Sequence, residues 1–214
     1  MKKIWSIIAL ILTVFAIACD TEGSELPPKI DDDPAPQTPE LVVYAVGDYY
    51  EQGSVKGIIY KVADDGRSGM LLALEEGDCA WAWTMNLTGA NSATDGAFNL
   101  SQISSIADWK DNYPMFKWCA ELGSGWYVPS LKELYELYVA FNGKMGNNNT
   151  TMQKLFNGYI TKCGGTPLSR VAYRSSTEMA EYFAYMVDFA SGKTHDEYKS
   201  YRCKVRAVQP FVVE

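Results

Sequence analysis

The sequence predicts an α+β domain in which strands near both ends of the chain enclose helices in the middle. Residues 55–62 place Ile58, Tyr60 and Val62 on one face, and the segments 182–189 and 194–201 flank a turn at 190–193, which is typical of strands. Between these segments apolar residues recur at helical spacing, with Ser, Pro and Gly where helices begin or end. We therefore expect mostly antiparallel strands, two to four helices and long loops.

The first strands are expected at the start of the domain. Within residues 55–62, Ile58, Tyr60 and Val62 share one face. The Asp- and Gly-rich segment 64–69 predicts a turn. An ordered stretch over residues 41–45 and 47–50 is expected to lead into a hairpin-like pair of strands at 55–62 and 70–74. The segment 79–83 follows, before a polar loop at 86–96.

The helices are predicted from their first turns. Asn99 is expected to cap the first helix, and Pro114 fits the first turn of the second. Ser130 and Glu133 have the spacing of a capping box, and Thr151 is expected to cap a short last helix. Two strands follow over residues 182–189 and 194–201, joined by a turn at 190–193, and the strand 204–211 closes the domain.

The N-terminus carries an export signal. Lys2 and Lys3 precede the apolar run 4–15, so residues 1–18 read as a signal peptide. The following Ala16-Ile17-Ala18-Cys19 resembles the lipobox of bacterial lipoproteins, with Ala16 where most lipoboxes have Leu. We expect lipidation at Cys19 and a membrane partner held through that anchor. The alternative is an ordinary signal that is cut near Ala18 and leaves a plain cysteine.

The segment 19–40 is expected to be a tether. It is rich in Pro, Asp and Glu and cannot bury enough apolar surface to fold. Acidic residues after the lipidated cysteine also resemble the surface-export signal of lipoproteins in the Bacteroides group. Residues 41–214 then form a single domain. We expect an outer membrane lipoprotein that faces the cell surface or the periplasm.

Composition excludes several classes of function. The chain has 19 Lys and Arg against 26 Asp and Glu, a net charge of −7, which argues against nucleic acid as a partner. The single His, His195, lies beside Asp196 and Glu197 and is expected to be exposed, so neither a Ser-His-Asp arrangement nor a metal–water centre is predicted. We expect no catalytic residues, no metal and no cofactor.

Four cysteines follow Cys19, and an even number in an exported chain predicts two disulfides. Three connectivities are possible. We favour Cys79–Cys119 with Cys163–Cys203, and Cys119–Cys203 is the serious alternative.

Four ordered motifs carry a resemblance to a known family. Gly125-Trp126-Tyr127-Val128-Pro129-Ser130-Leu131-Lys132-Glu133-Leu134 is similar to the "G-W-x-L-P-(S/T)-x-x-E-L" signature of the Legionella collagen-like protein C-terminal domain and of its relative, the Fibrobacter succinogenes major paralogous domain. Tyr173-Arg174-Ser175-Ser176-Thr177-Glu178 resembles "Y-W-S-S-T-E", with Arg174 in place of Trp. Segments 187–192 and 205–208 resemble "V-x-F-x-x-G" and "V-R-x-V". The resemblance implies a C-type-lectin-like fold, and related domains include carbohydrate-binding adhesin tips.

We interpret the motif residues as structural. Trp126 and Pro129 are expected to set the entry to the helix that Ser130 and Glu133 cap. Ser175, Ser176 and Thr177 are expected to hydrogen-bond backbone around a core strand. Arg206 is expected to pair with Glu133 or Glu178, the last residue of the second motif.

The function expected is that of a non-catalytic binding domain on the cell envelope, adhesin-like, with a glycan or a surface protein as its ligand. Candidate binding loops are 90–97, 143–149 and 164–171, and stacking of Trp81 or Trp83 on a sugar ring is conceivable. The alternative is a structural or assembly subunit of a surface complex, such as a fimbria-associated protein.

Overall fold

A computed structural model describes residues 42–143 and 149–213. The signal peptide, Cys19 and the tether therefore lie outside the described residues, as does most of the predicted loop 143–149. Residues Leu41–Glu214 cluster as one compact unit. Within the described residues, none of the helices has the length and apolar character needed to cross a membrane.

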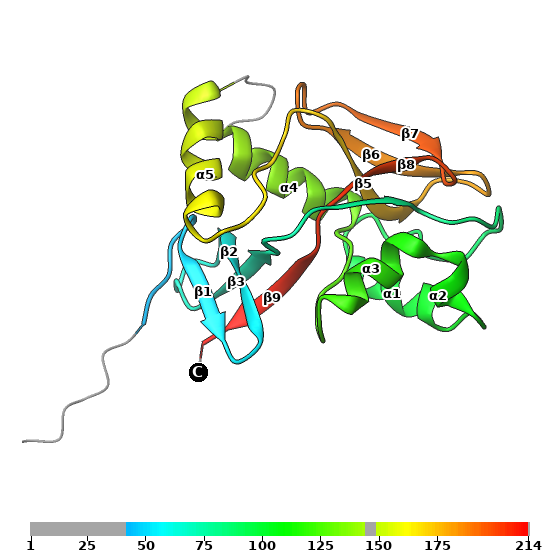
Figure 1. Ribbon diagram of the computed structural model, residues 1–214, viewed down its shortest axis with the longest axis horizontal. Helices are drawn as coiled ribbons and strands as arrows, with labels where there is room; N and C mark the ends of the chain where they lie inside the picture. Colours follow the sequence, from blue (N-terminus) through cyan, green and yellow to red (C-terminus); the bar gives the residue numbers. More distant parts are fainter. Residues whose placement is uncertain (1–41, 144–148, 214) are drawn as a thin grey trace, which may run out of the picture. The chain divides into compact units, whose positions relative to one another are not determined.

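Four antiparallel strands make the first sheet. They are β1 (Tyr49–Gln52), β2 (Val55–Val62), β3 (Ser68–Leu72) and β9 (Val208–Val212), in the order β1-β2-β3-β9 (Figure 1). The C-terminal strand thus pairs with a strand from the start of the domain. The strand predicted at 55–62 is confirmed at both ends, and its inward side chains Ile58 and Tyr60 are buried.

The second sheet has five strands in the order β4-β8-β5-β6-β7. They are β4 (Gly77–Ala80), β8 (Arg202–Val205), β5 (Ala172–Glu178), β6 (Phe183–Asp188) and β7 (Thr194–Tyr198). All the pairings are antiparallel except β5 with β8, which run parallel. The closing strand predicted over 204–211 is in fact two strands, β8 and β9, which belong to different sheets.

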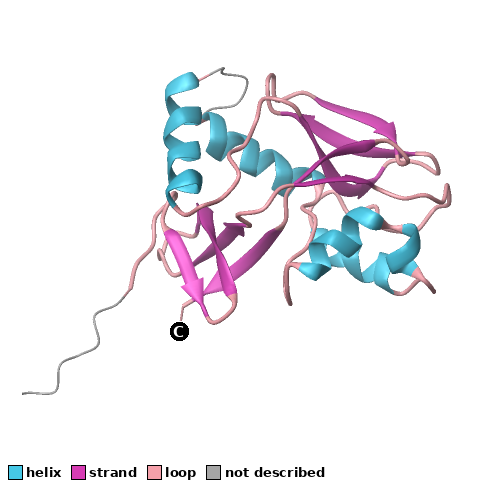
Figure 2. Cartoon of the chain, viewed as in Figure 1, coloured by secondary structure: helices cyan, strands magenta, loops and turns pink. Residues whose placement is uncertain are grey.

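Five helices occupy the described middle of the chain: α1 (Gly96–Ser104), α2 (Trp109–Asn112), α3 (Pro114–Glu121), α4 (Leu131–Asn142) and α5 (Thr150–Lys162) (Figure 2). With two mostly antiparallel sheets they confirm the α+β class. The capping box of Ser130 and Glu133 is present, and Pro114 lies in the first turn of α3.

Two predicted helix caps are wrong. Asp95, not Asn99, caps α1, because the helix begins at Gly96 and Asn99 lies within it. The buried Asn99 amide bonds Ser92 and, at 2.9 Å, Ser176 Oγ. Asn149, not Thr151, caps α5, which is a full 13-residue helix rather than a short one.

The core has two clusters of buried side chains. The first includes Trp81, Phe116, Cys119 and Trp126, and it lies where α3 packs on β4. The second includes Tyr138, Phe156 and Tyr173, and it lies under α4 and α5. Helix α4 contacts β2 of the first sheet as well as β5 and β6 of the second, so it stabilises both sheets.

All four described cysteines are free thiols, so the predicted disulfides Cys79–Cys119 and Cys163–Cys203, and the alternative Cys119–Cys203, are absent from this structure. Cys163 follows α5 and packs against the second core cluster, whereas Cys79 and Cys119 belong to the first. Strand pairing instead places Cys79 directly opposite Cys203.

Candidate functional site

The hydroxyl groups of β5 hold surrounding loops in place. Ser175 donates to the Tyr185 carbonyl at 2.8 Å. Thr177 donates to the Ser92 carbonyl at 2.8 Å and accepts from the Leu131 N–H at 2.9 Å. Ser176 accepts from Asn99, and its N–H donates to the Pro129 carbonyl at 2.8 Å. Because these side chains are buried, their bonds fix the start of α1 and of α4 against the sheet.

The segment that leads into α4, residues 126–130, is also buried. Trp126 is 5% exposed and packs in the first core cluster, and Pro129 is buried. The Glu133 carboxylate accepts from the Ser130 N–H at 2.8 Å, from the Gly96 N–H at 3.0 Å and from the Tyr127 hydroxyl at 2.9 Å. One side chain therefore joins the first turn of α4 to the first residue of α1.

A buried ion pair lies at the end of β5. Lys199 Nζ is 2.6 Å from Glu178 Oε1, with side chains that are 0% and 3% exposed. The Glu178 carboxylate also accepts from the N–H groups of Thr88 at 3.0 Å and Gly89 at 3.2 Å. Lys199 Nζ donates to the Asn86 carbonyl at 2.9 Å and lies 4.7 Å from the centre of the Trp81 ring. Burial lowers the pKa of Lys199, and the charge of Glu178 opposes that effect.

The predicted pairing of Arg206 with Glu133 or Glu178 is wrong. Arg206 lies in the two-residue link 206–207 between β8 and β9, beside the link 73–76 between β3 and β4. Its guanidinium donates to the carbonyls of Leu74 at 3.2 Å and Glu75 at 2.8 Å and to that of Thr166. Its charge partner is Glu76, with Nε 3.7 Å from Oε2.

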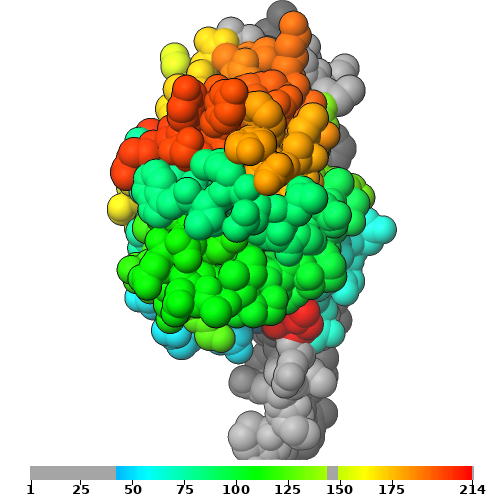
Figure 3. Space-filling model, turned by 90° about the vertical axis from the view of Figure 1, so that its right-hand side faces the viewer, coloured from blue at the N-terminus to red at the C-terminus, as the bar shows by residue number. Residues whose placement is uncertain are grey.

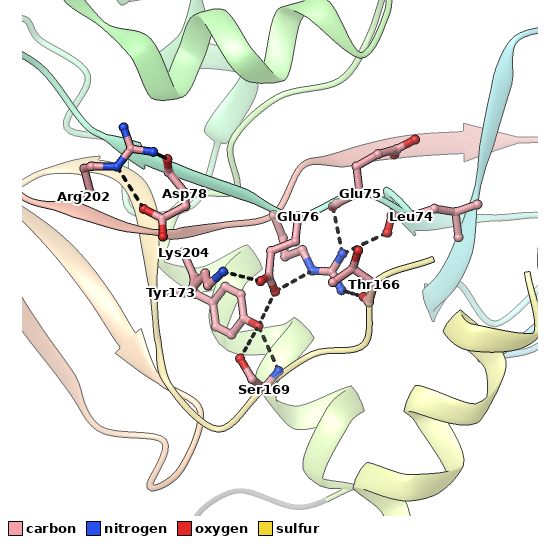
Figure 4. A network of polar contacts seen from close by, with 10 residues as sticks. Leu74, Glu75, Glu76, Asp78, Thr166, Ser169, Tyr173, Arg202 and Lys204 are labelled. Carbon is pink, nitrogen blue, oxygen red and sulfur yellow. Dashed lines mark hydrogen bonds and ion pairs between the residues drawn. The ribbon is translucent and has the colours of Figure 1, made fainter. Parts of the chain in front are cut away.

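Glu76 is the centre of a polar network between the two sheets (Figure 4). Its carboxylate accepts from the Tyr173 hydroxyl at 2.7 Å and lies 2.9 Å from Lys204 Nζ. The Ser169 N–H in turn donates to the Tyr173 hydroxyl at 3.0 Å. Both links between the sheets, residues 73–76 and 206–207, contribute to this network. We therefore interpret it as a structural contact that holds the two sheets together and not as a ligand site.

Four segments meet around the Glu178–Lys199 pair, and we call them the loop cluster: residues 81–83, 86–90, 178–183 and 198–201. Backbone bonds join them, because the Lys199 carbonyl accepts from the N–H groups of Trp81 at 2.8 Å and Ala82 at 3.2 Å, and the Lys199 N–H donates to the Tyr182 carbonyl at 2.8 Å. Figure 3 shows the face on which residues near 80–95 (teal) adjoin residues near 178–203 (orange to red).

The loop cluster exposes large apolar side chains. The Tyr198 ring contacts Phe183, with ring centres 4.6 Å apart, and Tyr201, at 5.5 Å, both in tilted arrangements. Trp81 is fully buried and cannot stack on a ligand, whereas Trp83 is 52% exposed. The exposed large apolar residues of the cluster are Trp83, Leu87, Met179, Tyr182, Tyr198 and Tyr201.

Polar groups border these rings. Glu181 and Asp196 are exposed, and Glu197 accepts from the Tyr198 N–H at 2.9 Å. Such a surface offers aromatic faces for stacking and carboxylates that accept hydrogen bonds. Sequence reasoning singled out Trp83 but missed the tyrosines. The density of aromatic residues between 182 and 201 is the signal that would have pointed to them.

The structure describes two of the three loops expected to bind ligand, 90–97 and 164–171. Of the segment 90–97, Ala90 is buried and its carbonyl accepts from the Glu178 N–H at 2.8 Å. Leu168, Ser169 and Arg170 of the loop 164–171 border an open cavity of about 440 Å³ beside α5. A larger apolar groove of about 550 Å³ lies between Tyr60, Tyr135 and Met152. Among the described residues no group of three His, Cys, Asp or Glu side chains is placed to hold a metal ion, and His195 lies exposed on β7.

The chain is similar in fold to a solved structure of a fimbrial protein from Bacteroides ovatus ATCC 8483. The TM-score is 0.51 at 16% sequence identity, over 67% of this chain. The match covers 35% of the fimbrial protein, so this chain corresponds to about a third of that molecule. No protein-family model matches the chain, and no curated protein matches it either. The resemblance to the Legionella and Fibrobacter domains stays a prediction.

Proposed function

We propose that this chain is an envelope lipoprotein whose domain is a non-catalytic binding module, with the loop cluster as its binding surface. The observation that carries the proposal is the group of contacting rings Phe183, Tyr198 and Tyr201 on loops that a buried ion pair holds in place. Exposed apolar patches with a polar border mark interaction sites, and a fixed loop loses little conformational entropy on binding.

A neutral glycan is the ligand class that this surface fits. The C–H faces of a sugar ring pack on the electron-rich faces of aromatic rings, and its hydroxyl groups donate to carboxylates. The cation of the cluster, Lys199, is buried and paired, and the adjacent Arg202 is paired with Asp78. With Glu181, Asp196 and Glu197 at the border, an anionic ligand would be repelled.

The test is a glycan array probed with the full-length chain purified in detergent. We expect reproducible binding to neutral saccharides, and a loss of at least about tenfold in affinity for Tyr198→Ala and for Tyr201→Ala. Tyr49→Ala is the matched control, because Tyr49 is an exposed tyrosine on the other sheet. Glycan binding that survives both cluster variants would exclude the loop cluster as the site.

A second candidate is a structural or assembly subunit of a surface complex, which the likeness to a fimbrial protein favours. The outer strand β7 carries His195, Asp196 and Glu197, and charges on an edge strand oppose pairing with another sheet. Partners would therefore meet the loop cluster rather than this edge. An array without hits, together with co-purification of envelope proteins that Tyr201→Ala abolishes, would favour this second function.

A further inference from the structure

Two cysteines face each other across the strands β4 and β8. Cys79 and Cys203 are direct partners in the antiparallel register, two positions from the pair Gly77 and Val205. A Cβ placed on Gly77 would meet Val205 and Trp118 of α3, so this face of the sheet packs on α3. Because side chains two residues apart share a face, both thiols lie on the same side.

The backbone geometry suits a disulfide. Directly opposed residues in an antiparallel pair have Cα atoms about 4.5–5.5 Å apart, and disulfides span about 4.4–6.8 Å between Cα atoms. Rotation of two half-buried side chains would bring the sulfurs together without a change in strand register. A bond here would fasten β4, an edge strand of four residues, to β8 next to the Glu76 network.

The other two cysteines are less well placed to form a disulfide with Cys79 or Cys203. Cys163 belongs to a different part of the fold, where it borders a cavity with Tyr49 and Tyr159. Cys119 is fully buried on α3 and belongs to the same core cluster that Cys79 packs against. Cys119 is thus the competitor for Cys79, but a bond to it would have to join a helix to a strand, with no register that sets the two residues opposite each other.

Arg174 contacts one of the two thiols. Its Nη2 atom lies 3.2 Å from Cys203 Sγ, and its guanidinium is held by the carbonyls of Ala184, Glu197 and Tyr198 at 2.9–3.0 Å. Burial raises the pKa of Cys203, and the fixed positive charge opposes that effect. A guanidinium at this distance stabilises the thiolate, which is the form that exchanges with disulfides.

We propose that Cys79 and Cys203 form a cross-strand disulfide when the reduced chain meets an oxidising disulfide. One thiolate attacks a sulfur of that disulfide and releases its other sulfur as a thiolate, which gives a mixed disulfide. The second cysteine thiolate then attacks the chain's own sulfur and displaces the remaining thiolate. The chain's two thiols have lost two protons and two electrons, and the oxidant leaves as two thiols.

The experiment uses the full-length chain, reduced and then incubated with oxidised glutathione, or isolated from cells after acid quenching. Free thiols are alkylated in denaturant, and non-reducing peptide mapping identifies linked peptides. We expect one linkage, Cys79 to Cys203, with Cys119 and Cys163 alkylated. Cys163→Ser is the matched control and should keep the linkage, whereas Cys79→Ser should leave Cys203 alkylated.

Two results would overturn the proposal. One is a linkage of Cys79 or Cys203 to Cys119. The other is alkylation of all four cysteines after exposure to oxidised glutathione and in the chain isolated from cells. Because the glutathione experiment needs no export, it tests the bond separately from the proposed envelope location.

Discussion

Replacing one partner of the Glu178–Lys199 pair is expected to destabilise the domain strongly. Lys199→Met keeps most of the side-chain volume but leaves a carboxylate that is 3% exposed without its cation. Breaking a buried pair by removing one partner costs about 3–5 kcal/mol, against a total of about 5–15 kcal/mol for a typical domain. The Thr88 and Gly89 N–H groups still donate to Glu178, which favours the lower part of that range.

A double-mutant cycle measures the interaction energy between Glu178 and Lys199. Glu178→Gln with Lys199→Met leaves no uncompensated charge, and a glutamine carbonyl can still accept from Thr88 and Gly89. We expect the double variant to lose about 2 kcal/mol less than the sum of the two single variants. The surface pair Lys56–Glu51 is the control, because its separation is 2.7 Å but its side chains are 51% and 47% exposed. Lys56→Met should leave the free energy of unfolding nearly unchanged.

The assay is urea unfolding of each variant, with amide hydrogen exchange as a local readout. Exchange of the Thr88 and Gly89 amides should accelerate in Glu178→Ala more than exchange in the first sheet, because their acceptor is lost. Strictly additive costs, or a loss below about 1 kcal/mol for Lys199→Met, would refute the claim that this pair organises the loop cluster.

Four further changes test other parts of the fold by thermal or urea unfolding. Trp126→Ala should cost about 3–5 kcal/mol because the ring is buried. Ser130→Ala should cost about 1 kcal/mol because the helix loses its N-cap. A Trp126→Ala variant as stable as wild type would instead make Trp126 a candidate for ligand binding. Burial raises the pKa of Tyr173 to about 12, so the neutral phenol is favoured in the folded state. Stability should therefore fall between about pH 10 and pH 12 by about 2 kcal/mol more than in Tyr173→Phe. An equal fall in stability with pH in the wild type and in Tyr173→Phe would contradict that prediction. Gly96→Ala should cost about 1–3 kcal/mol, because its Cβ would lie 2.5 Å from the Val128 carbonyl oxygen. An unchanged melting temperature would contradict this and show that the backbone shifts to accommodate the methyl group.

Local signals in the sequence predicted local structure well. The capping box at Ser130, Pro114 in the first turn of α3 and the strand 55–62 each depend on residues within a few positions of one another. Where a side chain bonds across the fold, the same signals failed. Asn99 has good N-cap chemistry, but its amide bonds Ser176, 77 residues away, which no local pattern shows.

Long-range partners were the part that the sequence could not supply. The chain has many acidic residues that could pair with Arg206. Its partner is Glu76 because the links 73–76 and 206–207, which join the two sheets, lie side by side. The cysteines show the same limit. Their spacing does not show that Cys79 lies opposite Cys203, because that position depends on the register of β4 against β8. Register follows from the packing of a whole strand and not from loop length.

The motifs that carry the family resemblance are engaged inside the fold, and this explains why they do not reveal a ligand. Ser176, Thr177, Glu178 and Glu133 each use their polar groups on the protein's own backbone or side chains, and Trp126 is buried. The exposed rings that we propose as the binding surface, Tyr198 and Tyr201 among them, lie outside all four motifs. A chain can therefore keep the structural motifs and change the loop cluster freely, provided that Glu178 still finds a cation such as Lys199. The ligand of the proposed binding surface therefore has to be determined from the loop cluster itself, because the motif residues are engaged within the fold.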